Sequence, residues 1–530
     1  MNKKIIFILG LIIVLALFVR VYKLGSVPPS LTWDEADVGY NAWTIANYGK
    51  DEWGEAFPLI FRSFGDDKQP VHIYSTALSV KLFGLSEFST RLPMAIYGAL
   101  NVLLVFLLVL VMFKNKTLAF LSSFLLAISP YNIHFSRFNH EANATLLFFL
   151  LGMLLFYLSF EKRKGFLVFS ALSFGISIIS YHSAKLVVPP MILALAVFYY
   201  KKLLSNKIYF VTASLIFAFF IILFLLEPRF MGLSRASQTS LGSEAIKQTS
   251  IYNKTGNMFL GKLEIISQNY LKNLSWEFLF TKGDPNPRLS SQVSGQFYKI
   301  DSLFLLLGLI YIFIKRSRSG FILVLWAILA PIPASITSES PHAARALFMM
   351  GSVNIISALG INFAISQIKL KKIRYSLLVF VLLIYFASFG QFIYNYFNNF
   401  ARNYAIDYQY GMKQVVEYAK ENPNYSHVFT TKLRGQPYIF YLYYLKYPLP
   451  DYLNNVVYNR GESSSFNMVD YFDKYYFDNW DPIESRPDAN VLYILTSSEY
   501  DGLRYKNLFD VKRVIYNPNE TIAFYLVSAN

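Results

Sequence analysis

The chain has 530 residues, of which 54% are hydrophobic, 18% aromatic and only 15% charged. Soluble domains carry roughly 25% charged residues, so this composition indicates a multi-pass integral membrane protein. The formal net charge of +16 could indicate nucleic-acid binding, but the lysines and arginines stand in short runs between apolar segments. The chain has no cysteine, which excludes disulfides, a thiolate nucleophile and a cysteine metal site.

Apolar windows of about 20 residues predict about eleven membrane-spanning helices. They lie near residues 5–22, 92–113, 117–130, 143–160, 166–181, 185–200, 208–226, 302–315, 320–337, 344–366 and 375–396. The first window follows two lysines and resembles a signal peptide, but it lacks a small-residue cleavage site. We therefore expect an uncleaved anchor.

Basic residues occur in every second loop between these windows, as at residues 162–164, 201–207 and 369–374. The positive-inside rule places these loops and the N-terminus in the cytoplasm. The other loops then face outward, and they hold nearly all the unusual polar residues. These are Asp34, Glu35, Asp37, Arg62, Asp66, Asp67, Lys68, His134, Arg137, His140, Glu141, His182, Lys185, Glu339, His342 and Arg345.

The first outward segment, residues 24–91, is too polar to cross a membrane. Its four charges at positions 62, 66, 67 and 68 would cost on the order of 10 kcal/mol at the bilayer centre. We expect two short helices here, near residues 34–48 and 70–83, lying along the membrane surface.

The stretch TWDEADVGYNAW, residues 32–43, allows two interpretations. Thr32 and Glu35 have the spacing of a capping box, in which the side chains satisfy the free amides at a helix start. Alternatively, Asp34 or a neighbouring acid has a chemical role, because charge at the mouth of a membrane helix is costly unless it faces water or functions.

The second long outward loop, residues 227–300, is rich in Ser, Gln and Asn and punctuated by Gly and Pro. We expect it to be helical at most between residues 246 and 276. It is either a lid or acceptor guide or an ordinary mobile loop.

Beyond about residue 405 the composition changes. The pattern predicts a helix at 411–422, a strand at 427–431, an aromatic helix at 438–447, a strand at 491–496 and a hairpin around 517–519. Residues 401–530 are therefore expected to form a small α/β domain outside the cell. Its aromatic residues either stack on sugars or form its core.

Four motifs occur in a fixed order: TWDEADVGYNAW, SFGDDKQP, KLFGLSEFSTRLP and SPYNIHFSRFNHEAN. Together they resemble the bacterial GT-C glycosyltransferase superfamily, and within it the protein O-mannosyltransferase and lipid A aminoarabinose transferase group (family 39 type). The motifs cover about the first 145 residues, and the topology extends the likeness to about residue 400. The resemblance implies a transmembrane GT-C catalytic domain over residues 1–400, followed by the extracytoplasmic domain over 401–530, which carries no matching motif.

Enzymes of this group transfer a sugar from a polyprenyl-phosphate carrier to an acceptor hydroxyl at the outer membrane face, with inversion. By its match to the first motif, Asp34 is implied as the catalytic base, with Glu35 capping or orienting. Glu141 matches the second acidic motif; the alternative is an ordinary carboxylate at a helix start. The acceptor is a protein, a lipid or a glycan, and the residues leave this choice open.

The leaving lipid phosphate needs fixed cations or a metal. The resemblance implies Lys68, in the family's Lys-Pro position (here KQP), and Arg345, in PHAAR, as its ligands. Gln69 departs from the frequent Lys-Pro-Pro pattern, which weakens the assignment without removing the lysine. Some relatives hold a divalent metal, and Asp67 and His342 would be its ligands here, although one acid and one histidine make a weak metal motif.

The alternative function is a transporter or flippase of lipid-linked sugars. A transporter more often places polar groups in mid-span and contains an inverted repeat, and the sequence shows neither. A scaffold protein is a third alternative, but it gives no reason to gather acids and bases on one face.

Overall fold

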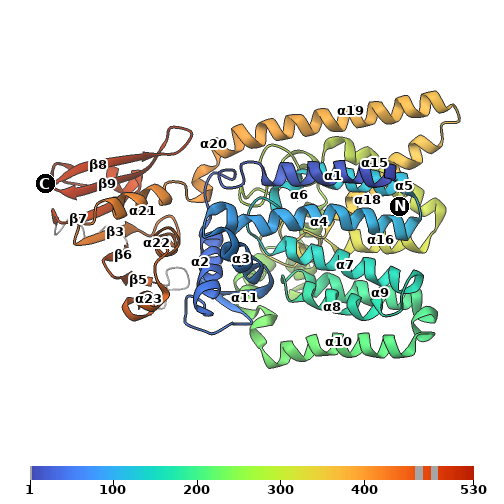
Figure 1. The fold of residues 1–530 in the computed structure, drawn as a ribbon, viewed down its shortest axis with the longest axis horizontal. Helices are drawn as coiled ribbons and strands as arrows, with labels where there is room; N and C mark the ends of the chain where they lie inside the picture. The colour runs from blue at the N-terminus through green and yellow to red at the C-terminus, as the bar shows by residue number, and fades with distance from the viewer. Residues whose placement is uncertain (1–2, 460–468, 479–486) are drawn as a thin grey trace. The chain divides into compact units, whose positions relative to one another are not determined.

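The computed structural model describes residues 3–459, 469–478 and 487–530. Its contacts divide the chain into two compact units. We call the first the helical unit; it comprises Met1–Tyr22 and Met94–Tyr396. The second, the mixed unit, comprises Lys23–Pro93 and Phe397–Asn530 (Figure 1). The first outward segment therefore belongs to the same compact unit as the C-terminal residues, whereas the sequence had grouped it with the membrane helices.

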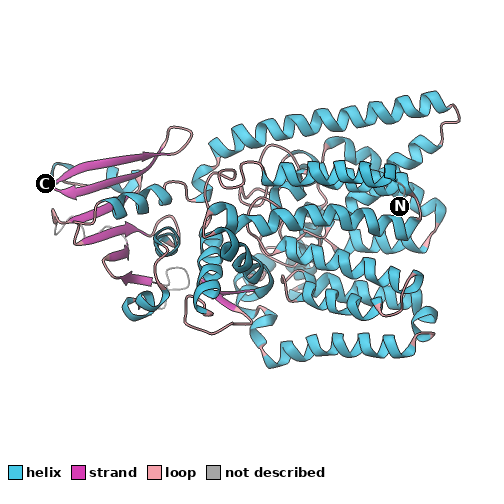
Figure 2. Ribbon diagram, viewed as in Figure 1, coloured by secondary structure: helices cyan, strands magenta, loops and turns pink. Residues whose placement is uncertain are grey.

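The helical unit consists of helices joined by loops (Figure 2). Its elements are α1 (Lys3–Val21), most of α4 (Glu87–Phe113), α5 (Lys116–Ile128), α6 (Pro130–Phe135), α7 (Ala142–Glu161), α8 (Phe166–Ile178), α9 (Ala184–Leu204), α10 (Lys207–Leu226), η1 (Pro228–Met231), α11 (Leu233–Thr239), α12 (Ser243–Lys247), α13 (Ser250–Thr255), α14 (Met258–Asn273), η2 (Glu277–Thr281), α15 (Lys299–Lys315), α16 (Arg318–Leu329), α17 (Ile332–Ser335), α18 (Met349–Ser366) and α19 (Lys371–Asn395).

Each predicted span coincides with a helix, which confirms the multi-pass helical fold. Among the described residues, eight helices are long and apolar enough to cross a membrane. Three further helices coincide with predicted spans but are shorter: α5 and α8 have 13 residues each and α15 has 17. The count of eleven spans and the orientation of the termini stay predictions.

The predicted helix range of 246–276 contains α13 and α14, but helix in this loop begins earlier than predicted, with α11 and α12. Four α-helices, α11 to α14, occupy residues 233–273. Local caps account for two of them, because the Thr249 hydroxyl accepts a hydrogen bond from the Tyr252 amide and the Asn257 side chain accepts from the Phe259 amide. Asn269 of α14 also donates to the carbonyl of Ser335, so a tertiary contact fixes the longest helix.

The mixed unit combines helices with two sheets. Its elements are α2 (Trp33–Tyr48), β1 (Phe61–Ser63), β2 (Asp66–Lys68), α3 (Pro70–Phe83), α20 (Ala401–Asn403), η4 (Ala405–Tyr408), α21 (Met412–Glu421), β3 (His427–Thr431), α22 (Pro437–Leu445), α23 (Leu449–Asn455), β4 (Val457–Tyr458), β5 (Val469–Phe472), β6 (Tyr475–Asp478), β7 (Val491–Leu495), α24 (Ser497–Gly502), η5 (Lys506–Leu508), β8 (Phe509–Tyr516) and β9 (Ile522–Ala529); η3 (Tyr396–Phe400) lies at the boundary between the units.

The large sheet has the strand order β4-β5-β6-β3-β7-β9-β8. Strand β3 is parallel to β6 and to β7, and the remaining pairs are antiparallel. The predicted α/β domain is confirmed, with α21, β3, α22, β7 and the β8–β9 hairpin where the sequence placed them. The sequence missed β4, β5 and β6, because strands of two to four residues are too short to show alternation and are stabilised mainly by their neighbours.

Helix α2 and the C-terminal segment share one hydrophobic core. Val38 and Ala42 of α2 are buried in it together with Tyr438 and Leu442 of α22. A Cβ atom on Gly39 would lie 2.4 Å from the Tyr443 ring, so glycine permits the close approach of α22 to α2. This shared core explains why residues 23–93 belong to the same unit as residues 397–530.

Candidate active site

Helix α2 begins with a capping box. The Thr32 hydroxyl accepts a hydrogen bond from the Glu35 amide at 3.2 Å, and the Glu35 carboxylate accepts one from the Thr32 amide at 3.2 Å. The capping interpretation of this pair is confirmed. It fixes the first turn of α2, in which Asp34 and Glu35 also interact favourably with the helix dipole.

Glu35 also forms a buried ion pair with Arg91 at the start of α4. The guanidinium donates to both carboxylate oxygens, at 2.8 and 2.9 Å, and both side chains are 0% exposed. Arg91 additionally donates to the carbonyls of Leu24 and Pro28. Both carboxylate oxygens of Glu35 are therefore engaged inside the protein, in the helix cap and in the ion pair with Arg91; its role in orienting the site stays a prediction.

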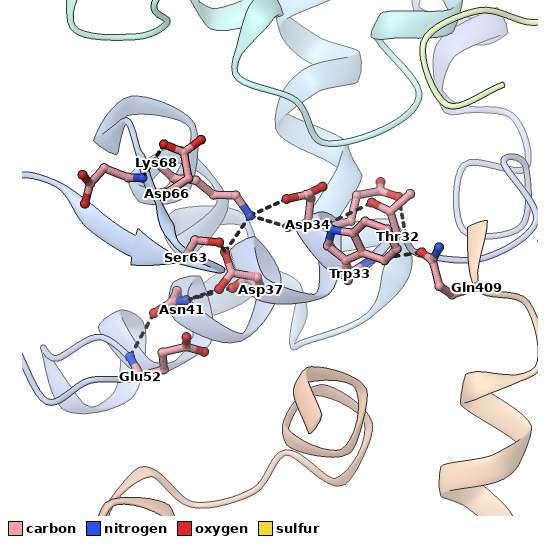
Figure 3. A network of polar contacts seen from close by, with 12 residues as sticks. Thr32, Trp33, Asp34, Asp37, Asn41, Glu52, Ser63, Asp66, Lys68 and Gln409 are labelled. Carbon is pink, nitrogen blue, oxygen red and sulfur yellow. Dashed lines mark hydrogen bonds and ion pairs between the residues drawn. The ribbon is translucent and has the colours of Figure 1, made fainter. Parts of the chain in front are cut away.

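A two-stranded hairpin brings Lys68 to the first turn of α2. Strands β1 and β2 pair in antiparallel register, with Ser63 opposite Asp66 and Phe61 opposite Lys68. The turn residues Phe64 and Gly65 both have positive φ, 47° and 73°, as a tight two-residue hairpin turn requires. The hairpin thus carries Ser63 and Lys68 to the same face of α2 (Figure 3).

Lys68 bridges two aspartates of α2. Its Nζ lies 3.0 Å from Asp34 Oδ1 and 2.8 Å from Asp37 Oδ2 (Figure 3). The two acids are three residues apart and so share one face of the helix. Their environments differ, because the Asp34 side chain is 48% exposed while that of Asp37 is 0% exposed.

Asp37 is the buried centre of this network. It accepts hydrogen bonds from the Ser63 hydroxyl at 3.0 Å and from the Asn41 carboxamide at 3.0 Å. Asn41 in turn accepts from the Glu52 amide at 2.9 Å (Figure 3). The sequence indicated Asp37 as one of the clustered acids, without a role, and did not indicate Asn41 or Ser63. The i, i+3 spacing of Asp34 and Asp37 was the available signal for Asp37; no local pattern indicates the other two.

Burial and charge act against each other at this ion pair. Burial lowers the pKa of Lys68, but the charges of Asp34 and Asp37 outweigh it and raise the pKa above its ordinary value. Lys68 is therefore a cation at neutral pH. Burial raises the pKa of Asp37, and the charge and hydrogen bond of Lys68 oppose this rise. The lysine is thus the group that stabilises a buried carboxylate here.

Three predicted site residues lie in the helical unit. Arg345 donates to the Glu339 carboxylate at 3.0 Å and to the Thr337 hydroxyl at 2.8 Å. The His342 ring accepts a hydrogen bond from the Arg345 amide at 3.3 Å. Glu141 directly precedes α7 and is its N-cap residue, in keeping with the helix-start alternative.

The structure therefore shows two sets of predicted residues. It brings Asp34 and Lys68 into contact within the mixed unit, and Arg345 and His342 into contact within the helical unit. That both sets serve one site stays a prediction, as does the catalytic role of Glu141.

The possible metal site at Asp67 and His342 has no further acidic or histidine ligand set among the described residues. Within the part of the chain that the structure describes, no group of three or more His, Cys, Asp or Glu side chains is arranged to hold a metal. The two expected ligands, Asp67 and His342, belong to different units. A divalent metal held by these two residues therefore stays a prediction.

Comparison with known proteins supports the resemblance seen in the sequence. Residues 67–225 match the family model described as dolichyl-phosphate-mannose-protein mannosyltransferase. The crystal structure of ArnT from Cupriavidus metallidurans bound to undecaprenyl phosphate superposes with a TM-score of 0.56, at 13% identity, over 98% of this chain and 97% of that one. This protein has the GT-C glycosyltransferase fold. The resemblance drawn from the four motifs is confirmed.

Two further matches agree. The archaeal oligosaccharyltransferase AglB from Archaeoglobus fulgidus, in complex with an inhibitory peptide and a dolichol-phosphate, superposes with a TM-score of 0.51 at 15% identity, over 83% of this chain and 64% of that one. A putative mannosyltransferase of Bacillus subtilis (strain 168), YkcB, is 34% identical over 134 residues, which is 25% of this chain. The aligned part spans only 18% of that relative's length.

Proposed function

We propose that this protein is a membrane glycosyltransferase that moves a sugar from a polyprenyl-phosphate carrier to an acceptor hydroxyl, with inversion at the anomeric carbon. The fold, the family model and the carriers named in the two structural relatives support this proposal. The observation that carries it is Asp34. This carboxylate is half exposed, yet a partly buried cation and the capped first turn of α2 hold it in place.

Asp34 is the catalytic base in this proposal. As the acceptor oxygen attacks the anomeric carbon, its proton passes to Asp34, and the bond between the anomeric carbon and the phosphate oxygen breaks. Polyprenyl phosphate leaves with that bonding electron pair. A positioned general base contributes typically about 10²–10⁴ in rate. The contact with Lys68 orients the carboxylate and leaves its exposed edge available to the acceptor.

Lys68 retains one donor for the leaving phosphate. An ammonium group has three N–H donors. Two of them are directed at the carboxylates of Asp34 and Asp37, and the third makes only a long 3.4 Å contact with the Asp34 carbonyl. A phosphate oxygen would replace that weak contact with a charge-assisted bond. Arg345 is the second proposed phosphate ligand, in competition with Glu339.

The orientation is part of the proposal. With the N-terminus in the cytoplasm, the mixed unit lies on the outer face, where it would meet both the carrier lipid and an acceptor on a protein, lipid or glycan. The same orientation follows from the positive-inside rule.

The test is turnover of a short-chain polyprenyl-phosphate sugar by the purified protein, followed as release of polyprenyl phosphate. Asp34→Asn should lower kcat by about 10²–10⁴ without changing the thermal unfolding midpoint. Asp451→Asn, at an exposed aspartate of α23, is the matched control and should retain activity. Full activity of Asp34→Asn refutes Asp34 as the base. No release by the wild-type protein refutes the enzyme and favours a transporter or flippase.

A further inference from the structure

The first turn of α2 is capped from the C-terminal segment as well as locally. The first amides of a helix have no partner inside the helix. The Glu35 amide finds one in Thr32, and the Trp33 amide donates to the side-chain oxygen of Gln409 at 3.2 Å (Figure 3). Asp34 stands between these two capped positions. The end of the chain therefore completes the turn that carries the proposed base.

Gln409 is itself fixed. Its side chain is 5% exposed, and its Nε2 donates to the Asp407 carbonyl at 3.2 Å. That bond directs the oxygen of the carboxamide toward the Trp33 amide. The same carboxamide thus bonds both the Asp407 carbonyl and the Trp33 amide.

A second residue of the C-terminal segment packs against the same tryptophan. Gly435 has a φ of 103°, and a Cβ atom at this position would lie 2.4 Å from Trp33 Cε3 and 2.6 Å from Cζ3. Such distances do not occur between a real Cβ and a ring carbon, so the indole lies directly on the glycine backbone. Any side chain at position 435 would displace Trp33 or the loop.

The loop that presents Gly435 is anchored on both sides. It follows the carboxyl end of β3, which lies between the parallel strands β6 and β7. This edge is where open α/β sheets place their functional loops. In the loop, Arg434 donates to the Ala523 carbonyl at 3.0 Å, and its guanidinium stacks 4.6 Å from the Phe524 ring centroid.

We infer that the C-terminal segment is part of the catalytic apparatus: Gln409 and Gly435 are positioning residues that hold Trp33, and through it the first turn of α2, so that Asp34 keeps its orientation. This inference rests on the proposed function. It gives the C-terminal domain, which carries no family motif, a direct structural role beside the base.

The first experiment measures kcat and the donor KM of Gly435→Ala in two backgrounds. A misplacement of about 1 Å can cost roughly 10²-fold, so Gly435→Ala should lower kcat roughly 10–100-fold while the donor KM changes little. In a Trp33→Ala background, where the ring is absent, the same substitution should cause no further loss of kcat. The strain of an alanine at positive φ is present in both backgrounds. Its effect on stability is measured separately, as the thermal unfolding midpoint of each variant. Gly54→Ala is the matched control, because Gly54 has a φ of 85° in the same unit but faces Leu453 rather than Trp33.

The second experiment separates capping from folding and still applies if Gly435→Ala does not fold. Gln409→Glu loses the bond to the Asp407 carbonyl but keeps a side-chain oxygen for the Trp33 amide, so it should keep a higher kcat than Gln409→Met, which lacks that oxygen and should lower kcat about tenfold. Equal kcat values for the two variants overturn the inference, as does an equal loss from Gly435→Ala in both backgrounds. In either case the wild-type enzyme remains active and the proposed function stands. An inactive wild-type protein refutes the proposed function and the inference with it.

Discussion

Two ion pairs start from adjacent residues of α2, and they differ in their access to solvent. Glu35 and Arg91 are both 0% exposed, and every carboxylate oxygen has a partner. The neighbouring cluster of Asp34, Asp37 and Lys68 has one buried acid and one acid that is 48% exposed. Consecutive helical residues point about 100° apart, so one turn supplies both environments. The sealed pair is part of the scaffold, whereas the open cluster leaves the Asp34 carboxylate accessible to solvent, as the proposed base requires.

The largest effect on stability is expected at the sealed pair. Arg91→Met leaves the buried Glu35 carboxylate without its cation, which should destabilise the fold by about 3–5 kcal/mol. The thermal unfolding midpoint in detergent should fall accordingly. Arg62→Met is the control, because Arg62 is exposed on β1 and should cost little. An unchanged unfolding midpoint for Arg91→Met would show that the sealed pair of Glu35 and Arg91 does not stabilise the fold.

A smaller effect is expected for the open cluster of Asp34, Asp37 and Lys68, and it should appear in the donor KM. Lys68→Ala removes the donor proposed for the leaving phosphate and should raise the donor KM roughly tenfold, the size of one charge-assisted hydrogen bond. Its effect on the unfolding midpoint should be smaller than that of Arg91→Met. Lys413→Ala, which removes a peripheral pair with Glu87, is the control for loss of a lysine. Initial rates that show an unchanged donor KM would argue against a phosphate contact.

A pH-dependent effect concerns a buried acid that is stabilised by amides instead of a cation. Asp51 accepts hydrogen bonds from the Trp53 and Glu55 amides at 3.0 and 2.8 Å. Burial raises the pKa of Asp51 to about 6, and these bonds oppose the rise. Because the folded pKa exceeds the unfolded value of about 3.9, the contribution of Asp51 to stability is present below about pH 4 and is lost as the pH rises toward 6.

Asp51→Asn keeps a side-chain oxygen for both amides but cannot ionise. Its unfolding midpoint relative to wild type should therefore be higher at pH 7 than at pH 4. Midpoints of the two proteins measured across this range test the sign. A difference that is the same at both pH values would show that Asp51 does not titrate in this interval.

Local patterns predicted most of the fold. Apolar windows of about 20 residues located the membrane helices, and the alternation of short polar and apolar runs located α21, β3, α22 and the β8–β9 hairpin. The capping box at Thr32 and Glu35 was visible from spacing alone and is confirmed. Helices α11 and α12 and strands β4 to β6 were missed, because they are short and depend on partners distant in the sequence.

The sequence by itself determined that this is a multi-pass membrane protein of GT-C fold and that Asp34 and Lys68 are candidates for one site, since apolar segments, charges and motif order are local properties. Only the tertiary structure decided that Lys68 lies between Asp34 and Asp37, that Arg91 neutralises Glu35, and that Gln409 and Gly435 hold Trp33. These contacts join residues separated by 31 to 402 positions along the chain. No periodicity records such pairings, because burial of apolar surface and the pairing of buried charge select them only when the chain folds.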